Sequence, residues 1–390
     1  MTAFTDGHQV ELLEGGGTYF PALERAFDRA LHEIHLQVYI FEDDEAGRAV
    51  TDALVRAAQR GVLVHVLIDG FGGRTMSLEL RAKLLDGGVE LLFFRPQVSL
   101  LDFQRSRLRR LHHKLACVDG LVGFVGGINV IHDMHTPGHT PPRWDYAVQV
   151  RGPITRDILR VARHTWERVA WTYLRERRGQ WPQAYAAPAV PVAAGYIRAA
   201  LLIRDTLRHR RDIEQAYLEA IGSAQHEVLI ANAYFLPGVE FRHALIGAAR
   251  RGVRVTLLLQ ARVEYVLMHH ASRALYDQLL EAGIEIFEYH QSFMHAKVAV
   301  IDRRWSTVGS SNIDPLSLLL AREANVFVLD ETFAGELHAS LTRAMHEGAR
   351  AVVRGRWRRG WAARAASWLS YWLVRVLLGW AGYGARKDYL

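Results

Sequence analysis

The chain has 390 residues, with 48 Lys and Arg against 41 Asp and Glu, which gives a formal net charge of +7. Half of the residues are hydrophobic, so the chain can bury the cores of two domains of ordinary size. A single cysteine, Cys117, excludes a disulfide framework within the chain. The sequence does not begin with the pattern of a signal peptide, and its positive charge favours an anionic partner.

In chain order, the first half predicts alternating helices and strands. A helix over 23–31 is followed by an apolar strand that ends near Tyr39. An amphipathic helix and a strand over 62–70 come next. A helix over 78–85 and a strand over 89–94 complete the unit.

The second half repeats this order. The predicted elements are a helix over 212–224, a strand ending near Tyr234, an amphipathic helix, a strand over 253–260, a helix over 272–282 and a strand over 284–287. Strands that alternate with helices predict an α/β fold, with a mainly parallel or mixed sheet covered on both faces. We expect two duplicated halves, 1–176 and 201–349, separated by an Ala/Pro-rich linker at 177–200 and followed by a tail at 350–390.

A catalytic pattern occurs twice with identical spacing. Positions 112–129 read HHKLACVDGLVGFVGGIN, and positions 295–312 read HAKVAVIDRRWSTVGSSN. In each copy, His is followed by Lys at +2, Asp at +7, Gly at +14 and Asn at +17. Two matched copies in a repeated sequence indicate a functional site. The matched residues are His112, Lys114, Asp119, Gly126 and Asn129 in the first copy and His295, Lys297, Asp302, Gly309 and Asn312 in the second.

The spacing predicts one wall of an active site in each half. On a strand, residues i and i+2 point the same way, so each His shares a face with its Lys. Small residues after the next strand let backbone N–H groups approach an anionic oxygen. Two such walls suit phosphodiester chemistry: one neutral His attacks phosphorus, and the other, protonated, donates to the leaving oxygen. Lys and Asn stabilise the non-bridging oxygens, so we expect neither a metal nor a cofactor.

These copies resemble the phospholipase D superfamily, whose signature is H-x-K-x4-D-x6-G-[GS]-x-N in two copies. The resemblance implies two α/β/α sandwich halves with the active site at their interface. It also implies a covalent phosphohistidine, which water or an alcohol then attacks, and a catalytic set that includes Asp119 and Asp302. By family tendency His112 is the nucleophile and His295 the acid, a choice that the residues themselves leave open. The first copy has Gly127 where Ser is common, whereas the second has Ser310.

Two acids follow the signatures at corresponding places. Asp145 lies in RWDYAVQV and Glu323 in REANVFVLD, both predicted as strands. The resemblance implies that such an acid binds the far nitrogen of an active-site His, which fixes its tautomer and raises its basicity. The alternative is an ordinary salt bridge at a strand edge, because Arg143 and Arg322 lie close by in the sequence.

The tail combines Trp and Arg, which favours a helix at a membrane interface. An apolar stretch at 365–383 is interrupted by Arg375, so we interpret it as interfacial and not as a membrane span. A helix packed on the protein body and a nucleic-acid surface are the alternatives. The residues expected to bind the membrane are Trp357, Trp361, Trp368, Trp372, Arg358 and Arg359.

Within the superfamily, the chain resembles the shorter class of bacterial cardiolipin synthases, which lack N-terminal spanning helices and end in a basic apolar tail. This resemblance implies transfer of a phosphatidyl group from phosphatidylglycerol to the hydroxyl of a second lipid. We expect a peripheral protein on the cytoplasmic face of the cell membrane, with an anionic phospholipid surface as partner and no obligatory protein partner. The alternatives are a phospholipase D hydrolase that releases phosphatidic acid, a nuclease, which we disfavour because such nucleases have shorter chains, and a membrane scaffold with a vestigial site.

Overall fold

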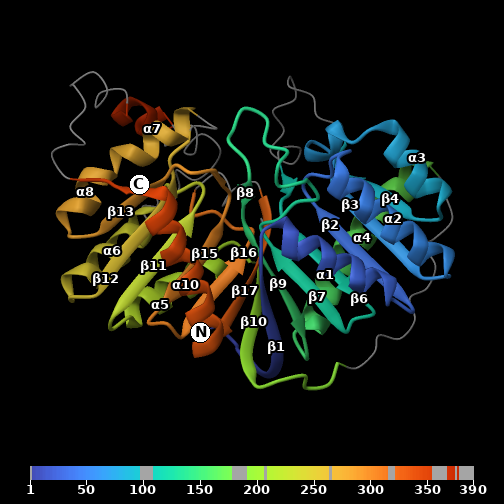
Figure 1. Cartoon of the computed structure of the whole chain (residues 1–390), viewed down its shortest axis with the longest axis horizontal. Coiled ribbons are helices and arrows are strands. Elements are labelled where there is room, and N and C mark those ends of the chain that lie inside the picture. Colours follow the sequence, from blue (N-terminus) through green and yellow to red (C-terminus); the bar gives the residue numbers. More distant parts are fainter. Residues whose placement is uncertain are drawn as a thin grey trace.

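The computed structural model describes residues 2–96, 109–177, 191–205, 209–262, 266–314, 321–353, 367–373 and 376. Two lobes lie on either side of a set of central strands, with α1–α3 on the outside of one lobe and α5, α6 and α8 on the outside of the other (Figure 1). The bounds of the elements in the first lobe are β1 (Thr5–Glu14), α1 (Gly16–Asp28), β2 (Glu33–Val38), α2 (Glu45–Gln59), β3 (Leu63–Asp69), η1 (Gly72–Thr75), α3 (Leu78–Asp86), β4 (Glu90–Phe94), β5 (Arg110–Leu111), β6 (Lys114–Val118), β7 (Val122–Gly126), β8 (Arg143–Trp144), β9 (Tyr146–Arg151) and α4 (Thr155–Arg177).

The second lobe repeats most of this order. Its elements are β10 (Ile197–Arg204), α5 (Asp212–Ser223), β11 (Glu227–Asn232), α6 (Val239–Arg250), β12 (Arg254–Gln260), α7 (Val266–Ala274), α8 (Tyr276–Glu281), β13 (Glu285–Tyr289), β14 (Phe293–Met294), β15 (Lys297–Ile301), β16 (Trp305–Gly309), β17 (Ala321–Leu329), α10 (Glu331–Gly348) and β18 (Ala349–Ala351).

One mixed sheet runs through both lobes, in the order β18-β13-β12-β11-β15-β16-β17-β10-β1-β9-β7-β6-β2-β3-β4. Strands β2, β3 and β4 are parallel to one another, as are β11, β12 and β13. The lobes join where β1 pairs with β10 in antiparallel fashion. All six residues of β2 are buried, although its sequence alternates polar and apolar residues, because helices cover both faces of the sheet.

Local sequence signals set the starts of the long helices. The side chain of Asp44 accepts a hydrogen bond from the Gly47 N–H at 3.0 Å and caps α2. Asp330 caps α10 in the same way by accepting from the Phe333 N–H at 2.8 Å. The buried apolar residues form a separate core under each outer helical layer and a third core along the central strands.

The predicted fold class is confirmed: the structure is α/β, and its sheet is mixed and repeated in two parts. The strands β1 and β10, which join the lobes, were not predicted. The single helix expected over 272–282 is divided between α7 and α8. Strand β10 begins at Ile197, inside the stretch predicted as a linker, and the division of the chain into domains stays a prediction.

Candidate active site

The two signature histidines lie just before two equivalent buried strands. His112 precedes β6 and His295 precedes β15, and the side chains of these histidines are 19% and 9% exposed. Lys114 and Lys297 are the first residues of the two strands, and both are almost completely buried. Each ammonium donates a hydrogen bond to the backbone oxygen of its own His, at 2.6 Å for Lys114. The predicted His and Lys of each copy therefore share one wall.

Each histidine is bound by the acid of the other half. Nδ1 of His112 lies 2.9 Å from Oε1 of Glu323, and Nδ1 of His295 lies 2.7 Å from Oδ2 of Asp145. Donation from Nδ1 to a carboxylate leaves Nε2 of each ring as the reactive nitrogen. The contacts predicted from the resemblance are therefore present in the structure, and they cross between the halves.

Two short strand pairs produce this crossing. Strand β5, just before His112, pairs in parallel with β17, and the His112 N–H donates to the Arg322 oxygen at 3.0 Å. Strand β14, just before His295, pairs in parallel with β8, and the His295 N–H donates to the Trp144 oxygen at 2.8 Å. The acid that follows Arg322 or Trp144 is thereby held beside the histidine of the opposite lobe.

The two acid–histidine pairs differ in electrostatics. Burial raises the pKa of Glu323, but His112 and the nearby Arg204 outweigh it and lower this pKa to about 2. The Glu323 carboxylate is thus ionised at any physiological pH. For His112, burial lowers the pKa more than Glu323 raises it, so the ring is neutral at pH 7. A neutral imidazole that donates Nδ1–H to a carboxylate is a good nucleophile.

In the second pair, the pKa of the acid is raised and not lowered. Burial raises the pKa of Asp145 to about 6, although Lys297 opposes this shift from 3.8 Å. Burial, Lys297 and Arg143 together lower the pKa of His295 well below its ordinary value. Because the two groups are in hydrogen-bond contact, the proton that enters near pH 6 belongs to the pair. This pair can supply a proton to a leaving group.

A buried lysine also titrates near neutrality. Burial lowers the pKa of Lys114 to about 7, with a further lowering by Lys297 that Glu323 and Asp145 oppose. Lys114 and Lys297 are both desolvated, so an anion that binds between the two walls interacts strongly with their ammonium groups.

The difference between Gly127 and Ser310 matches the difference between the two acids. The Ser310 hydroxyl donates to Oε2 of Glu323. A Cβ at Gly127 would collide with the carboxylate oxygens of Asp145. The absence of a side chain at Gly127 thus leaves room for the Asp145 carboxylate. In the second copy, the Ser310 hydroxyl is used in its hydrogen bond to Glu323.

The structure corrects the expectation for the signature glycines. Gly126 lies where a Cβ would come 2.5 Å from the Ala147 Cα, and a Cβ at Gly309 would overlap the Asn325 side chain. The N–H groups that follow them donate to Tyr146 and Ala324 within the sheet. These glycines therefore permit close strand packing, and those N–H groups do not face an anion.

The amides are buried at the site. Oδ1 of Asn129 accepts from the Ile40 N–H at 3.0 Å, which orients its amide. Oδ1 of Asn312 has no hydrogen-bond partner within the part of the chain that the structure describes.

The structure does not place the signature aspartates at the site. Asp119 lies at the far end of β6 from Lys114, where its carboxylate accepts three backbone N–H groups, from Leu31, His32 and Glu33. Asp302 does the same for Gln225, His226 and Glu227. Each Asp follows its Lys by five residues along a strand, at about 3.3 Å a residue, so a catalytic role for these two acids stays a prediction without support from the geometry. They hold the start of the neighbouring strand.

Three residues at the site were not predicted to be functional. The ring of Tyr39 lies 5.0 Å from the His112 ring and 5.6 Å from the Lys114 ammonium, and the ring of Tyr234 lies 6.5 Å from that of His295. Arg204 lies 3.7 Å from Glu323. The two tyrosines occupy the same place in both repeats, and this match could have identified them as site residues. No sequence pattern indicated a role for Arg204.

Part of the predicted membrane-binding set can be located. Trp368 and Trp372, in the helical stretch 367–373, are 55% and 64% exposed. Trp357, Trp361, Arg358 and Arg359 lie outside the described residues. Among the helices that the structure describes, none is both long and apolar enough to cross a bilayer.

Comparison with known proteins identifies the family. A family model described as "Cardiolipin synthase, PLD-like domain" matches residues 23–136 and 217–345. Cardiolipin synthase B of Escherichia coli is 37% identical over 350 residues, covering 87% of this chain and 81% of that protein. Cardiolipin synthase B of Salmonella typhimurium is 35% identical over 389 residues, covering 96% and 90%.

A solved structure supports the same fold. The phosphatidylserine synthase of Haemophilus influenzae superposes with a TM-score of 0.69, covering 96% of this chain and 95% of that one at 13% identity. The site has two His–acid pairs that each join one half to the other, and the relatives cover most of the chain. The chain therefore belongs to the phospholipase D-like family of cardiolipin synthases.

Proposed function

We propose that this protein is a cardiolipin synthase that transfers a phosphatidyl group from one phosphatidylglycerol to the hydroxyl of another phospholipid and releases glycerol. The pair of histidines, each bound by an acid of the other half, carries the proposal. Such an arrangement supplies one nucleophile and one proton donor to a single phosphodiester. The curated relatives that cover most of the chain are named cardiolipin synthases, which supports the choice of substrate class.

In the first proposed step, Nε2 of His112 attacks the phosphorus of phosphatidylglycerol. The bond from phosphorus to the glycerol oxygen breaks, and His295 gives its proton to that oxygen. Ionised Glu323 stabilises the positive charge that develops on the His112 ring. Lys114 and Lys297 stabilise the charge on the non-bridging oxygens.

In the second step, the acceptor hydroxyl attacks the phosphohistidine. Its proton passes to His295, the bond from phosphorus to nitrogen breaks, and His112 is restored. The products are cardiolipin and one glycerol, so no oxidant or other reactant is needed. If water attacks instead, the product is phosphatidic acid, and this competition separates a synthase from a phospholipase D.

The proposed location is peripheral, on the cytoplasmic face of the membrane. Along 367–376, the exposed side chains are Trp368, Leu369, Trp372, Leu373 and Val376, which follow helical spacing, whereas Tyr371 packs against the core of the second lobe. An exposed apolar face on a docked helix favours insertion into the lipid interface.

The test is product analysis on phosphatidylglycerol vesicles, with release of glycerol measured beside cardiolipin. We expect equal amounts of both from the wild type and neither from His112→Ala. The matched control is His243→Ala, because His243 is exposed on α6, away from the site. Phosphatidic acid without cardiolipin contradicts the synthase proposal and makes the protein a hydrolase. Equal turnover by His112→Ala and the wild type contradicts the assignment of the nucleophile.

A further inference from the structure

A cluster of five arginines lies beside the active site, four from elements of the first lobe and one from β17. It consists of a residue after β4, two residues at β5, one on α4 and one on β17. Four of them are half-buried and Arg168 is exposed. We call this set the arginine cluster: Arg95, Arg109, Arg110, Arg168 and Arg322.

Three members of the cluster lie over aromatic rings, two of them over the same ring. The guanidinium of Arg95 lies 5.3 Å from the centre of the Phe94 ring, and that of Arg322 lies 5.8 Å from the same ring. Arg110 lies over Phe71 at 5.5 Å. Mutual repulsion is evident because burial and the four other arginines lower the pKa of Arg95 to about 10. Gathering five cations in this way is unfavourable unless an anion binds.

No acid within the described chain forms an ion pair with these five arginines. Asp69, the acid near Arg110, accepts instead from the N–H groups of Leu111, Phe71 and Gly72. The charge of Asp205 opposes the lowering of the Arg322 pKa. The Asp205 carboxylate accepts a hydrogen bond from the His209 N–H at 3.0 Å.

Two N–H donor groups of the cluster have no hydrogen-bond acceptor among the described residues. Nη1 of Arg95 and Nη1 of Arg110 are buried without a hydrogen-bond partner among the described residues. Arg95 also has a backbone φ of 51°, in the left-handed region that side chains rarely adopt. Buried unsatisfied donors and backbone strain persist where a ligand uses them.

The cluster is next to the reacting groups. Arg110 lies two residues before His112, and Arg322 directly precedes Glu323. A cavity of about 500 Å³ opens beside Arg168 and Arg322; its lining also includes Glu323 and the acids Asp157, Asp205 and Asp212, and lacks Arg95, Arg109 and Arg110.

The second lobe has fewer arginines around the corresponding place: Arg143 lies over the Phe293 ring at 4.8 Å, and Arg262 donates to the His290 oxygen at 3.1 Å. Superposition of the repeats by their strand registers and histidines matches Arg95 with His290, Arg109 with Ser292 and Arg110 with Phe293. The residue before Glu323 is Arg322, whereas the residue before Asp145 is Trp144. Trp144 packs on Tyr289 at 5.0 Å between ring centres. The catalytic groups are duplicated, and the arginine cluster is not.

We propose that the arginine cluster binds the phosphodiester of the second lipid, the acceptor, while its headgroup hydroxyl reaches the phosphohistidine on His112. This inference rests on the proposed function. Two lipids that play different roles need two different phosphate sites, and only one can lie at the duplicated lysines. Guanidinium groups bind a phosphodiester through paired N–H donors, which suits the orphaned Nη1 atoms.

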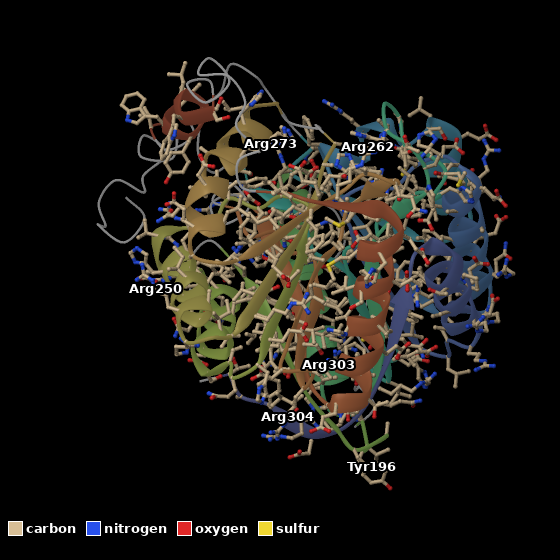
Figure 2. The ribbon with its side chains drawn as sticks, turned by 60° about the vertical axis from the view of Figure 1, so that its left-hand side comes forward. Tyr196, Arg250, Arg262, Arg273, Arg303 and Arg304 are labelled. Atoms are coloured by element: carbon tan, nitrogen blue, oxygen red, sulfur yellow. The ribbon has the colours of Figure 1, made fainter. Side chains whose placement is uncertain are left out.

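The first test is binding without turnover. His112→Ala protein is titrated with glycerophosphoglycerol, the soluble headgroup diester, by calorimetry. We expect two molecules to bind per chain, and only one when Arg95→Met and Arg322→Met are added. Arg250→Met is the matched control, since Arg250 is exposed at the end of α6, in the outer helical layer of the second lobe (Figure 2). One molecule bound before the arginines are changed, or two bound after, overturns the inference.

The second test is the partition of products on phosphatidylglycerol vesicles. In the Arg95→Met, Arg322→Met protein, water replaces the lipid acceptor, so the ratio of cardiolipin to phosphatidic acid falls by about tenfold or more while glycerol release continues. An unchanged ratio overturns the inference. The Arg95→Lys, Arg322→Lys protein keeps the charge, and we expect it to retain two bound molecules, which separates a binding effect from misfolding. If the wild type forms no cardiolipin, the proposed function fails, and the calorimetry still decides on the cluster.

Discussion

Glu323, in the second lobe, binds Nδ1 of His112, in the first, at 2.9 Å, although 211 residues separate them in the sequence. The contact depends on the parallel pairing of β5 with β17. Its counterpart joins His295 to Asp145. Neither lobe alone therefore contains a complete His–acid pair.

Removing the charge of either acid should abolish most turnover and leave the fold intact. We expect Glu323→Gln and Asp145→Asn each to lower kcat by about 10²–10⁴-fold, because the amide no longer stabilises a charged imidazole ring. Product assays and thermal unfolding measure the two effects. Glu336→Gln, on the surface of α10, is the control. Wild-type rates in both acid variants would show that the pairs are ordinary salt bridges.

Exchanging Gly and Ser between the copies should have unequal effects. In Gly127→Ser, the new Cβ displaces the Asp145 carboxylate from His295, so we expect kcat to fall by about tenfold or more. Ser310→Gly removes one hydrogen bond to Glu323, which Arg204 still holds, so its loss should be smaller. Steady-state rates of the two variants test this order, and a larger loss in Ser310→Gly contradicts it.

The signature aspartates should affect stability more than chemistry. Asp119→Ala leaves three backbone N–H groups without an acceptor, and we expect a loss of roughly 2–4 kcal/mol in the free energy of unfolding. The folded fraction should keep its turnover rate. Denaturant titration measures the first, and activity per folded molecule the second. The exposed Asp86→Ala is the control; a folded but inactive Asp119→Ala protein restores the catalytic interpretation.

Asp302 adds a pH dependence to this stability. Burial raises its pKa, but the N–H groups of Glu227, Gln225 and His226 outweigh it and lower the pKa below the ordinary 3.8. Its contribution is therefore present above pH 3.8 and is lost as the pH falls through the lower, folded value. Unfolding curves of the wild type and Asp302→Asn should converge in acid, and a difference that stays constant contradicts the assignment.

The rate should fall on the alkaline side of neutrality. The pKa of Lys114 in the free protein is about 7, so its ammonium is lost as the pH rises, and kcat/KM declines above about pH 7. An anionic phosphodiester raises this pKa, so kcat should persist to higher pH than kcat/KM. Profiles between about pH 5 and pH 10 test the separation. A kcat/KM that stays level to pH 9 contradicts the role of Lys114.

The exposed helical face of the tail should control vesicle binding. We expect Trp368→Ser with Trp372→Ser to weaken binding to phosphatidylglycerol vesicles by about tenfold or more, with activity on soluble short-chain lipid nearly unchanged. Truncation after Gly348 should do the same. Trp171→Ser, at another exposed Trp, controls for the substitution. Unaltered vesicle binding in the double variant assigns this helix to packing alone.

Spacing in the sequence was sufficient to predict the duplicated catalytic residues. His112 and Lys114 share a face because a strand has a period of two, and the same holds for His295 and Lys297. The α/β class followed from alternating strands and helices, since apolar periodicity is a local property. The acids were found because both occupy the same place in the repeat.

Pairing across the molecule was decided only by the tertiary structure. The crossing of Asp145 and Glu323 to the opposite histidines depends on strand pairs between residues more than a hundred positions apart, which no local pattern encodes. The same is true of Asp119, whose spacing from Lys114 belongs to the signature while its three partners lie at and just before the start of β2. The arginine cluster also required the fold, because its members come from four separate segments of the chain. Local sequence determines which face a side chain takes, and long-range packing determines what it meets there.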